Sequence, residues 1–368
     1  MNKKDRIAIL TGGGDCAGLN AVIRAVTKKG ILEHGYEVIG IMDGYEGLIR
    51  QKIRALDLQD VSGILTLGGT ILGTSNKANP YKYAVLKGDT VEYSDRSKEV
   101  LEYVKRLDID ALVCIGGDGT LKIAKGLFDD GVPVIGVPKT IDNDIRGTDI
   151  TFGFDSAVAV VTEGIDRLHS TAQSHHRIMI VEVMGRTAGW IALHAGMAGG
   201  GDVILIPEIP YDMDVVADKV RERSKKGKRC SIIVIAEGAK PAGGDVIVKQ
   251  IVRDSGEPVR LGGISFVLAQ ELEDRTGLEA RAVVMGHLQR GGSPSSFDRV
   301  LATRLGTKVV DMIEARQFGY MVGVRCDALS QVSLEEVAQG PRLIPVENEL
   351  IRCARSIGVS FGVKYSGL

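Results

Sequence analysis

Short apolar runs alternate with longer amphipathic stretches along the chain, and glycines gather where an apolar run ends. The runs that predict strands are Ile7–Leu10, Val38–Met42, Ala111–Ile115, Pro133–Val137, Ile178–Val183, Val203–Ile206 and Ser231–Ala236. The stretches that predict helices are Ala21–Lys29, Leu121–Phe128, Ser156–His169, Ala188–Ala198 and Ile264–Arg275. Continuous apolar strands between helices are typical of mostly parallel sheets covered on both faces.

The strand and helix rhythm restarts near residue 150, and 368 residues are enough for two domains. The 47 glycines cluster after strands rather than in linkers, which indicates backbone that approaches a ligand closely. We therefore expect an α/β protein with ligands at the carboxyl ends of its strands.

Composition excludes several classes of partner. A net charge of -1 gives no basic field for nucleic acid or acidic membranes, and 5% aromatics give no platform for stacked bases. No apolar stretch approaches the ~18 residues of a membrane span. The five cysteines are scattered without a CxxC pair, which argues against disulfides and zinc and favours reduced thiols in the cytoplasm.

Two glycine-rich loops follow predicted strands. In the first glycine loop, Gly12–Gly14, the pattern matches a dinucleotide fingerprint, but the same geometry suits any phosphate at a helix N-terminus. The second glycine loop, Gly116–Thr120, contains Asp118, a hard oxygen ligand suited to Mg²⁺ bound with substrate phosphates. A carboxylate there would repel the pyrophosphate of a dinucleotide, so the second loop favours phosphoryl transfer.

A third segment places Lys139 and Thr140 just before the acidic turn, Asp142–Asp144. Phosphorylation of a hydroxyl needs a carboxylate that accepts its proton and positive charge on the transferred group. Both kinds of group occur here within six positions, and a metal ion would supply further charge stabilisation. The competing interpretation is an Asx turn with a purely structural role.

Scattered basic residues could hold a phosphate monoester with forked donors. The candidates are Arg177, Arg186 in Met184-Gly185-Arg186, Arg281, His287 and Arg290. A single arginine is more often a surface ion pair. Glu237 follows a buried-looking strand and suits sugar hydroxyls, although a surface acid at a strand end is an equally simple interpretation.

Several ordered motifs together resemble the 6-phosphofructokinase family, of the phosphofructokinase A type, from about Arg6 to Tyr320. They are LTGGGDxxGLNAVIR, GGDGT, PKTIDND, SHHR, VEVMGRTAG and GHLQRGGSPSSFDR. The resemblance implies two Rossmann-like three-layer α/β domains with the active site in the cleft between them. Residues 1–153 and 289–339 should bind the phosphoryl donor and Mg²⁺, and residues 154–288 and 340–368 the sugar phosphate.

The resemblance also implies roles for single residues. Asp142 would take the proton from the 1-hydroxyl of fructose 6-phosphate, and Asp118 would bind Mg²⁺ with Asp144 close by. Donor-site residues would be Gly13, Asn76, Gly117, Asp118, Gly119 and Thr120. Sugar-phosphate residues would be Thr140, Asp142, Met184, Gly185, Arg186, Glu237, His287 and Arg290. Arg177 and Arg281 would reach the site of a neighbouring subunit, which implies a homodimer or homotetramer.

Two departures from the family pattern affect catalysis and regulation. The family usually has an arginine where Asn76 stands, and we infer that Lys77 replaces that arginine as a point charge. The expected catalytic residues are then Lys77, Lys139, Thr140, Asp142 and Arg186. Arg24, Lys226 and Lys228 fit the family's effector site, but His169 stands where an arginine is expected. Allosteric control therefore stays open.

The phosphoryl donor depends on two positions. Pyrophosphate-dependent members carry Asp and Lys where this chain has Gly119 and Lys139, whereas regulated ATP enzymes carry Gly at both. The mixed state occurs in a branch that mostly uses ATP, and Gly119 leaves room for an α-phosphate, so we expect ATP with pyrophosphate as the alternative. Other ketose phosphates, such as sedoheptulose 7-phosphate, stay open as acceptors.

Three other functions are weaker. An NAD(P)-linked oxidoreductase leaves Asp118 and Asp142 unexplained. A sugar-phosphate sensor without catalysis would be expected to lack the base. NAD kinases and lipid kinases share GGDGT but not PKTIDND.

Overall fold

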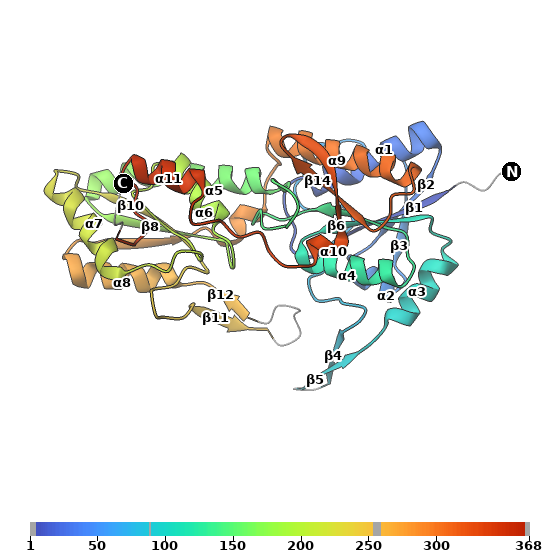
Figure 1. The fold of residues 1–368 in the computed structure, drawn as a ribbon, viewed down its shortest axis with the longest axis horizontal. Helices are drawn as coiled ribbons and strands as arrows, with labels where there is room; N and C mark the ends of the chain where they lie inside the picture. Colours follow the sequence, from blue (N-terminus) through green and yellow to red (C-terminus); the bar gives the residue numbers. More distant parts are fainter. Residues whose placement is uncertain (1–4, 88–89, 253–258, 365–368) are drawn as a thin grey trace. The chain divides into compact units, whose positions relative to one another are not determined.

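The computed structural model describes residues 5–87, 90–252 and 259–364. The chain forms two compact units (Figure 1). Unit 1 contains Met1–Ser156 and Arg290–Arg342, and unit 2 contains Ala157–Ile251, Val259–Gln289 and Leu343–Leu368. The chain therefore passes between the units more than once, and the expected assignment of functions to residues 1–153 with 289–339 and to the remainder stays a prediction.

A seven-stranded sheet forms the centre of unit 1. Its order is β15 (Ala328–Ser333), β14 (Tyr320–Arg325), β7 (Val134–Pro138), β6 (Ala111–Gly116), β1 (Arg6–Thr11), β2 (Glu37–Ile41) and β3 (Ile53–Leu56). The five inner strands are parallel, and the two edge strands are antiparallel to their neighbours. Every residue of β6 and β7 is buried, as expected for strands covered on both faces.

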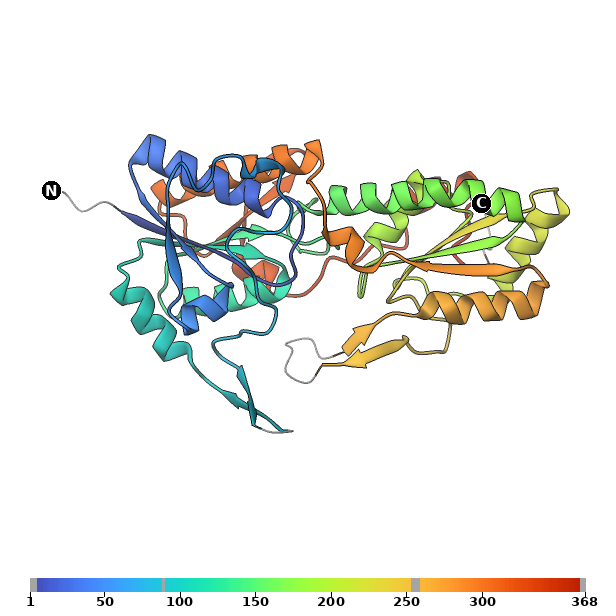
Figure 2. The ribbon, with the colours of Figure 1, turned by 180° about the vertical axis from the view of Figure 1, so that it is seen from behind.

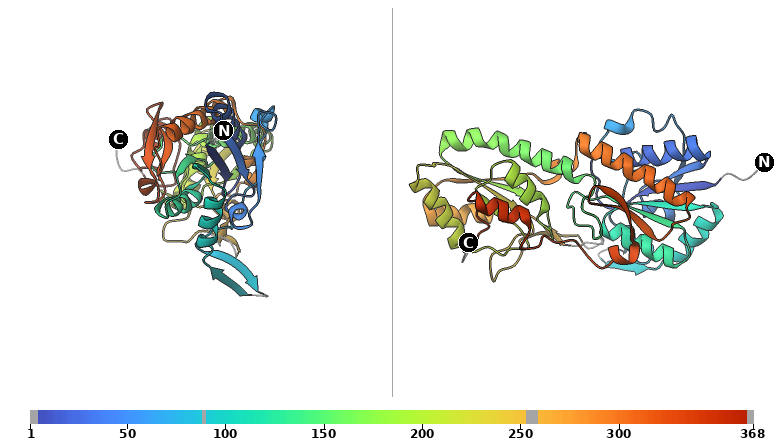
Figure 3. Two further views of the ribbon diagram at one scale, coloured as in Figure 1. Left: turned by 90° about the vertical axis from the view of Figure 1, so that its right-hand side faces the viewer. Right: turned by 45° about the horizontal axis from the view of Figure 1, so that its top comes forward.

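Helices cover both faces of this sheet. On one face α1 (Leu19–His34) packs against α9 (Ser296–Glu314). The other face carries α2 (Tyr45–Ile49), α3 (Ser97–Arg106), α4 (Asp118–Asp129) and α10 (Leu334–Val337), whose apolar side chains join those of the strands in one core. A short 3₁₀ helix covers Ile64–Thr66, and the hairpin of β4 (Tyr83–Lys87) and β5 (Thr90–Ser94) projects from unit 1 (Figure 3).

Unit 2 has a smaller parallel sheet in the order β13 (Ala280–Val284), β8 (Ile178–Val183), β10 (Ser231–Ala236) and β9 (Val203–Leu205). On one face lie α7 (Met213–Lys225) and α8 (Ile264–Thr276). The opposite face carries α5 (Phe154–His175), α6 (Trp190–Ala198) and α11 (Glu349–Ser356) (Figure 2). Unit 2 also has a hairpin of β11 (Val248–Ile251) and β12 (Val259–Leu261). A 3₁₀ turn, Gly286–Arg290, begins in unit 2 and ends at Arg290, where the chain returns to unit 1.

The fold class is confirmed, because each unit has three layers with a mostly parallel sheet in the middle. All seven expected strands and five expected helices are present, with ends that differ by a few residues. The sequence prediction did not name α9 or the antiparallel edge strands β3 and β15. None of the helices in the described part of the chain has the length and apolarity that a bilayer crossing requires.

A buried carboxylate joins the starts of α5 and α9. Asp298 is fully buried, and it accepts hydrogen bonds from the Ser156 backbone N–H at 2.8 Å and from its hydroxyl at 2.6 Å. The Ser156 hydroxyl in turn accepts from the Ser295 N–H at 2.9 Å, and Ser295 caps α9. Burial raises the pKa of Asp298 from 3.8 to about 6, with the repulsion from Asp155 as a smaller cause, although the bonds from Ser156 oppose the rise.

This pKa predicts a pH-dependent stability. The folded protein binds the Asp298 proton more tightly than the unfolded chain does, so the contribution is full below the unfolded pKa and is lost as pH rises through about 6. A rise of about two pKa units corresponds to about 3 kcal/mol. Asn keeps an acceptor for Ser156 without the charge. We therefore expect the Tm of Asp298→Asn to rise relative to that of the wild type between about pH 4 and about pH 6 in calorimetry. A Tm difference that is constant with pH would contradict this.

Candidate functional site

The carboxyl ends of three neighbouring parallel strands bring the predicted loops of unit 1 together. β1, β6 and β7 are adjacent, and they lead into the first glycine loop, the second glycine loop and the acidic turn. β1 is followed by β2 on one side of it, whereas β6 is followed by β7 on the other side. The point between β1 and β6 is therefore the topological switch point, where open α/β sheets bind their ligands.

Close packing against Thr120 requires glycine in both loops. A Cβ on Gly12 would lie 2.7 Å from the Thr120 Oγ1, and a Cβ on Gly116 would lie 2.3 Å from the Thr120 Cβ. The Gly12 N–H donates to the Ile115 carbonyl oxygen at 2.9 Å. Thr120 is buried, and its side chain fills the space between the two loops.

The first glycine loop is also bonded to the segment that carries Asn76 and Lys77. The Gly13 N–H donates to the Ser75 carbonyl oxygen at 3.0 Å, and the Thr74 hydroxyl donates to the Gly13 carbonyl oxygen at 2.7 Å. Asn76 and Lys77 are exposed beside it. Because the Gly13 amide already has an acceptor within the protein, a phosphate here would not depend on that N–H.

The second glycine loop opens α4. Gly117 precedes the helix and Asp118 is its first residue, so the orphan amides of the first turn face the same edge of the sheet. The Asp118 Oδ2 pairs with the Lys122 Nζ at 2.7 Å on the partly exposed helix surface. The other carboxylate oxygen of Asp118 can bind a hard cation while Oδ2 stays paired with Lys122. A Cβ on Gly119 would meet no atom within 4 Å, which leaves open space at that position.

Lys139 is buried, and its Nζ donates to the Gly14 carbonyl oxygen. Burial lowers its pKa, and nearby Arg290 adds to the lowering, while Asp15 and Asp142 oppose it. The expected role of this charge beside the transferred group stays a prediction. The structure places it against the first glycine loop, where it connects the end of β7 to the end of β1.

The acidic turn is held by local hydrogen bonds. The Asp142 N–H donates to the Thr140 Oγ1 at 3.1 Å. Thr151 binds both sides of the turn, because its N–H donates to the Asn143 Oδ1 at 3.0 Å and its hydroxyl donates to the Thr140 carbonyl oxygen at 2.8 Å. Asp142 and Asp144 are half-buried. The turn thus presents two carboxylates from a well-supported backbone.

Arg290 is a sugar-phosphate candidate that lies in unit 1. Its Nη1 donates to the Asp15 carbonyl oxygen at 3.1 Å, and a Cβ on Gly14 would lie 2.8 Å from the same nitrogen. The guanidinium therefore packs on the first glycine loop, and a phosphate bound by Arg290 would lie beside that loop.

The other sugar-phosphate candidates lie at the carboxyl ends of three neighbouring strands in unit 2. Met184, Gly185 and Arg186 follow β8, Glu237 follows β10 and His287 follows β13. The two loops after β8 and β10 are bonded together, because the Gly238 N–H donates to the Gly185 carbonyl oxygen at 3.1 Å.

Sequence reasoning missed Gln289 as the residue that supports this edge of unit 2. Gln289 is buried, accepts from the Met184 N–H at 3.2 Å and donates to the Gly286 carbonyl oxygen at 3.0 Å. An amide beside a predicted ligand, in a run otherwise rich in glycine, is the signal that could have identified it. Thr74 and Ser75 were missed in the same way in unit 1.

Arg177 and Arg281 lie at the opposite end of the unit 2 sheet. Arg177 directly precedes β8 and pairs with Glu279 at 2.6 Å, and Arg281 pairs with Glu273 at 3.1 Å and with Glu279. A six-residue strand spans roughly 20 Å. Within one chain, the structure therefore does not bring these arginines together with Met184, Glu237 and His287.

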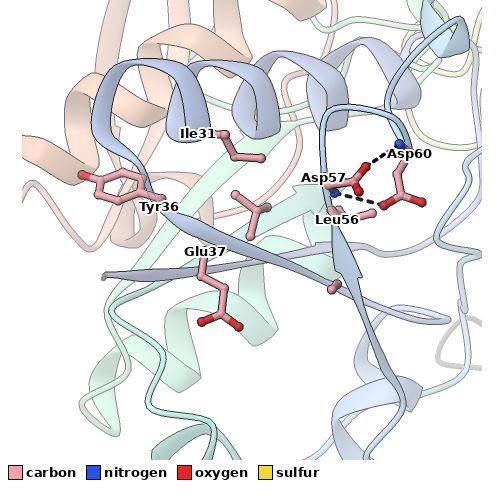
Figure 4. A pocket seen from close by; sticks show the side chains of 8 residues that line it. Ile31, Tyr36, Glu37, Leu56, Asp57 and Asp60 are labelled. Carbon is pink, nitrogen blue, oxygen red and sulfur yellow. Dashed lines mark hydrogen bonds between the residues drawn. The ribbon is translucent and has the colours of Figure 1, made fainter. Parts of the chain in front are cut away.

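A depression of about 430 Å³ on unit 1 does not coincide with the candidate site (Figure 4). It lies between α1, β2 and β3, at the amino end of β2, where Tyr36, Glu37 and Leu56 line it. Asp57 and Asp60 close one side by exchanging backbone-to-carboxylate bonds of 3.0 and 2.9 Å. The glycine loops lie at the other end of the parallel strands.

The contact between Gly12 and Thr120 predicts a defined packing defect. Gly12→Ala forces its Cβ into Thr120, and overpacking of this kind costs about 1–3 kcal/mol and a few degrees in Tm. Thermal unfolding should show this loss, and Thr120→Ala in the same chain should recover most of it. Gly119→Ala is the matched control and should not lower Tm, because its Cβ meets open space in the first turn of α4. An equal loss from Gly12→Ala with and without Thr120 would refute this packing.

Comparison with known proteins gives concordant matches. The sequence model of the family described as Phosphofructokinase matches residues 6–313. The ATP-dependent 6-phosphofructokinase 2 of Clostridium perfringens (strain 13 / Type A) is 54% identical over 366 residues, which cover 98% of this chain and 99% of that protein. The pyrophosphate–fructose 6-phosphate 1-phosphotransferase of Amycolatopsis mediterranei (strain S699) is 52% identical over 342 residues, which cover 93% of this chain and 97% of that protein.

A solved structure of phosphofructokinase from Saccharomyces cerevisiae superposes with a TM-score of 0.77 at 31% identity, covering 91% of this chain and 45% of that one. This chain therefore spans less than half the length of the yeast protein. The family match over most of the sequence, the two relatives aligned over nearly their whole length and the shared fold show that the chain belongs to the phosphofructokinase family.

Proposed function

We propose that this protein is an ATP-dependent 6-phosphofructokinase, which transfers the γ-phosphoryl group of ATP to the 1-hydroxyl of fructose 6-phosphate and gives fructose 1,6-bisphosphate in cytoplasmic glycolysis. One observation carries the proposal. In a chain of this family, the acidic turn and both glycine loops lie at the carboxyl ends of β7, β6 and β1, around the switch point of the sheet.

The acidic turn supplies the base in this proposal. Asp142 accepts the proton of the sugar hydroxyl as the new bond to phosphorus forms. Its backbone is fixed through Thr140, so the carboxylate keeps its direction during transfer. Asp118 and Asp144 have the hard oxygen atoms that Mg²⁺ prefers and would hold it, and the bound ion would neutralise charge on the phosphate oxygens.

The sugar phosphate is proposed to contact the edge of unit 2 formed by Met184, Gly185, Arg186, Glu237 and His287, together with Arg290. A forked arginine donor suits a phosphate monoester, and Glu237 suits a sugar hydroxyl. Lys77 remains proposed as a point charge for the transferred group, and the expected cleft between domains remains a prediction.

ATP is the proposed donor because Gly119 is open, with no atom within 4 Å of an added Cβ. An α-phosphate can use that space. Pyrophosphate is the second candidate, since the Amycolatopsis mediterranei relative is named for it and Lys139 is present here too. The Lys139 amine donates to the Gly14 carbonyl oxygen, so its charge does not by itself select the smaller donor.

Steady-state rates with fructose 6-phosphate and Mg²⁺ test the donor and the base together. We expect turnover with ATP and little with pyrophosphate. Asp142→Asn keeps the shape of the turn without the base, and its kcat should fall about 10²–10⁴-fold. Robust turnover with pyrophosphate alone would reverse the donor assignment, and an active Asp142→Asn enzyme would remove Asp142 as the base.

Arg177 and Arg281 are proposed to serve the site of a neighbouring subunit in a homodimer or homotetramer. Their position at the amino end of the unit 2 sheet supports this. Co-expressed Arg177→Ala and Asp142→Asn chains should then recover activity that neither has alone, in about a quarter of the sites of a two-fold dimer. Arg186→Ala co-expressed with Asp142→Asn is the matched control and should recover none. If the first mixture recovers no activity, Arg177 does not serve the site of a neighbouring subunit.

A further inference from the structure

One residue at the last passage of the chain between the units binds the backbone of the acidic turn. Unit 1 ends at Arg342, and unit 2 resumes at Leu343. The Arg342 N–H donates to the Asp144 carbonyl oxygen at 2.7 Å, and its Nη2 donates to the Asn143 carbonyl oxygen at 2.8 Å. Two successive carbonyl groups of the turn are therefore held by a single residue that is 198 positions away from Asp144.

These carbonyl groups control where the turn's carboxylates point. Asn143 adopts a left-handed conformation with φ of 51°, which is uncommon outside glycine although asparagine tolerates it better than most residues. Thr151 holds the Asn143 side chain from one side, and Arg342 holds the Asn143 and Asp144 carbonyl groups from the other. Rotation of either peptide unit would turn the Cα–Cβ bond of Asp142 or Asp144.

The chain continues from Arg342 into unit 2, where it is hydrogen-bonded again. The Ile344 N–H, two residues further on, donates to the Glu208 Oε1 at 3.0 Å. Glu208 also accepts from the Gly189 N–H, at 3.1 Å to each oxygen, at the start of α6. Ile344 is buried within unit 2. Arg342 is thus bonded within unit 1, and Ile344 is bonded within unit 2.

We propose that Arg342 is a positioning residue for phosphoryl transfer, which sets the direction of Asp142 and Asp144 through the carbonyl groups of their turn. This rests on the proposed function of the acidic turn. Arg342 does not replace any of the groups that contact substrate. It acts through the backbone, so its loss affects the transfer step more than substrate binding.

The test removes only the guanidinium. Arg342→Met keeps the backbone bond to Asp144 and loses the bond to Asn143. We expect kcat to fall about tenfold or more, because misplacement by about 1 Å can cost about 10²-fold, while KM for both substrates stays within about threefold. Arg342→Lys keeps a long cationic donor and should recover part of kcat. Arg146→Met is the matched control, because Arg146 is exposed on the same segment and bonds to Gly340 instead.

Hydrogen exchange of the peptide that covers residues 140–151 gives a readout that does not depend on activity. Arg342→Met should raise exchange there, and Arg146→Met should not. An unchanged kcat and unchanged exchange in folded Arg342→Met would overturn the proposal, as would equal losses of kcat in Arg342→Met and Arg146→Met. If Arg342→Met does not fold, Arg342→Lys decides by the same two measurements. A wild-type enzyme without turnover would refute the proposed function, and the exchange result would still decide the role of Arg342 in the turn.

Discussion

The adjacency of β1 and β6, two parallel strands whose connections leave in opposite directions, is the constraint on which the rest of unit 1 depends. Their carboxyl ends must carry loops that fit side by side, and the spacing of neighbouring strands leaves little room between them. Thr120 fills that room, so Gly12 and Gly116 cannot carry a Cβ. Glycine is required here by packing within the protein, before any ligand is considered.

Buried Lys139 follows from the same constraint. β7 lies next to β6, and the lysine at its end reaches across to the Gly14 carbonyl oxygen of the loop after β1. A buried ammonium group is costly unless it is hydrogen-bonded, and its lowered pKa reflects that cost. Carboxylates of Asp15 and Asp142 oppose the lowering. The side chain therefore connects the end of β7 to the loop after β1.

Sequence alone predicted the local elements well and their neighbours poorly. The apolar run Ala111–Ile115 could only be a buried strand, and it forms most of β6. Nothing local shows that β14 lies next to β7, because strand order is decided by packing between distant segments. The residue types of the candidate site were proposed from the motifs and from the family resemblance, and their roles stay predictions. Their hydrogen-bond partners could not be predicted, because Ser75 and Arg342 come from other parts of the chain.

The prediction of the phosphoryl donor was limited in the same way, because Gly119 and Lys139 had equal weight in the sequence pattern. The structure separates them. Lys139 is buried, and its ammonium group already donates a hydrogen bond to a backbone carbonyl oxygen within the protein. Gly119 lies in the first turn of α4, and no atom lies within 4 Å of a Cβ added to it. If the protein works as proposed, the volume left by Gly119 decides between ATP and pyrophosphate, and the lysine serves both donors alike.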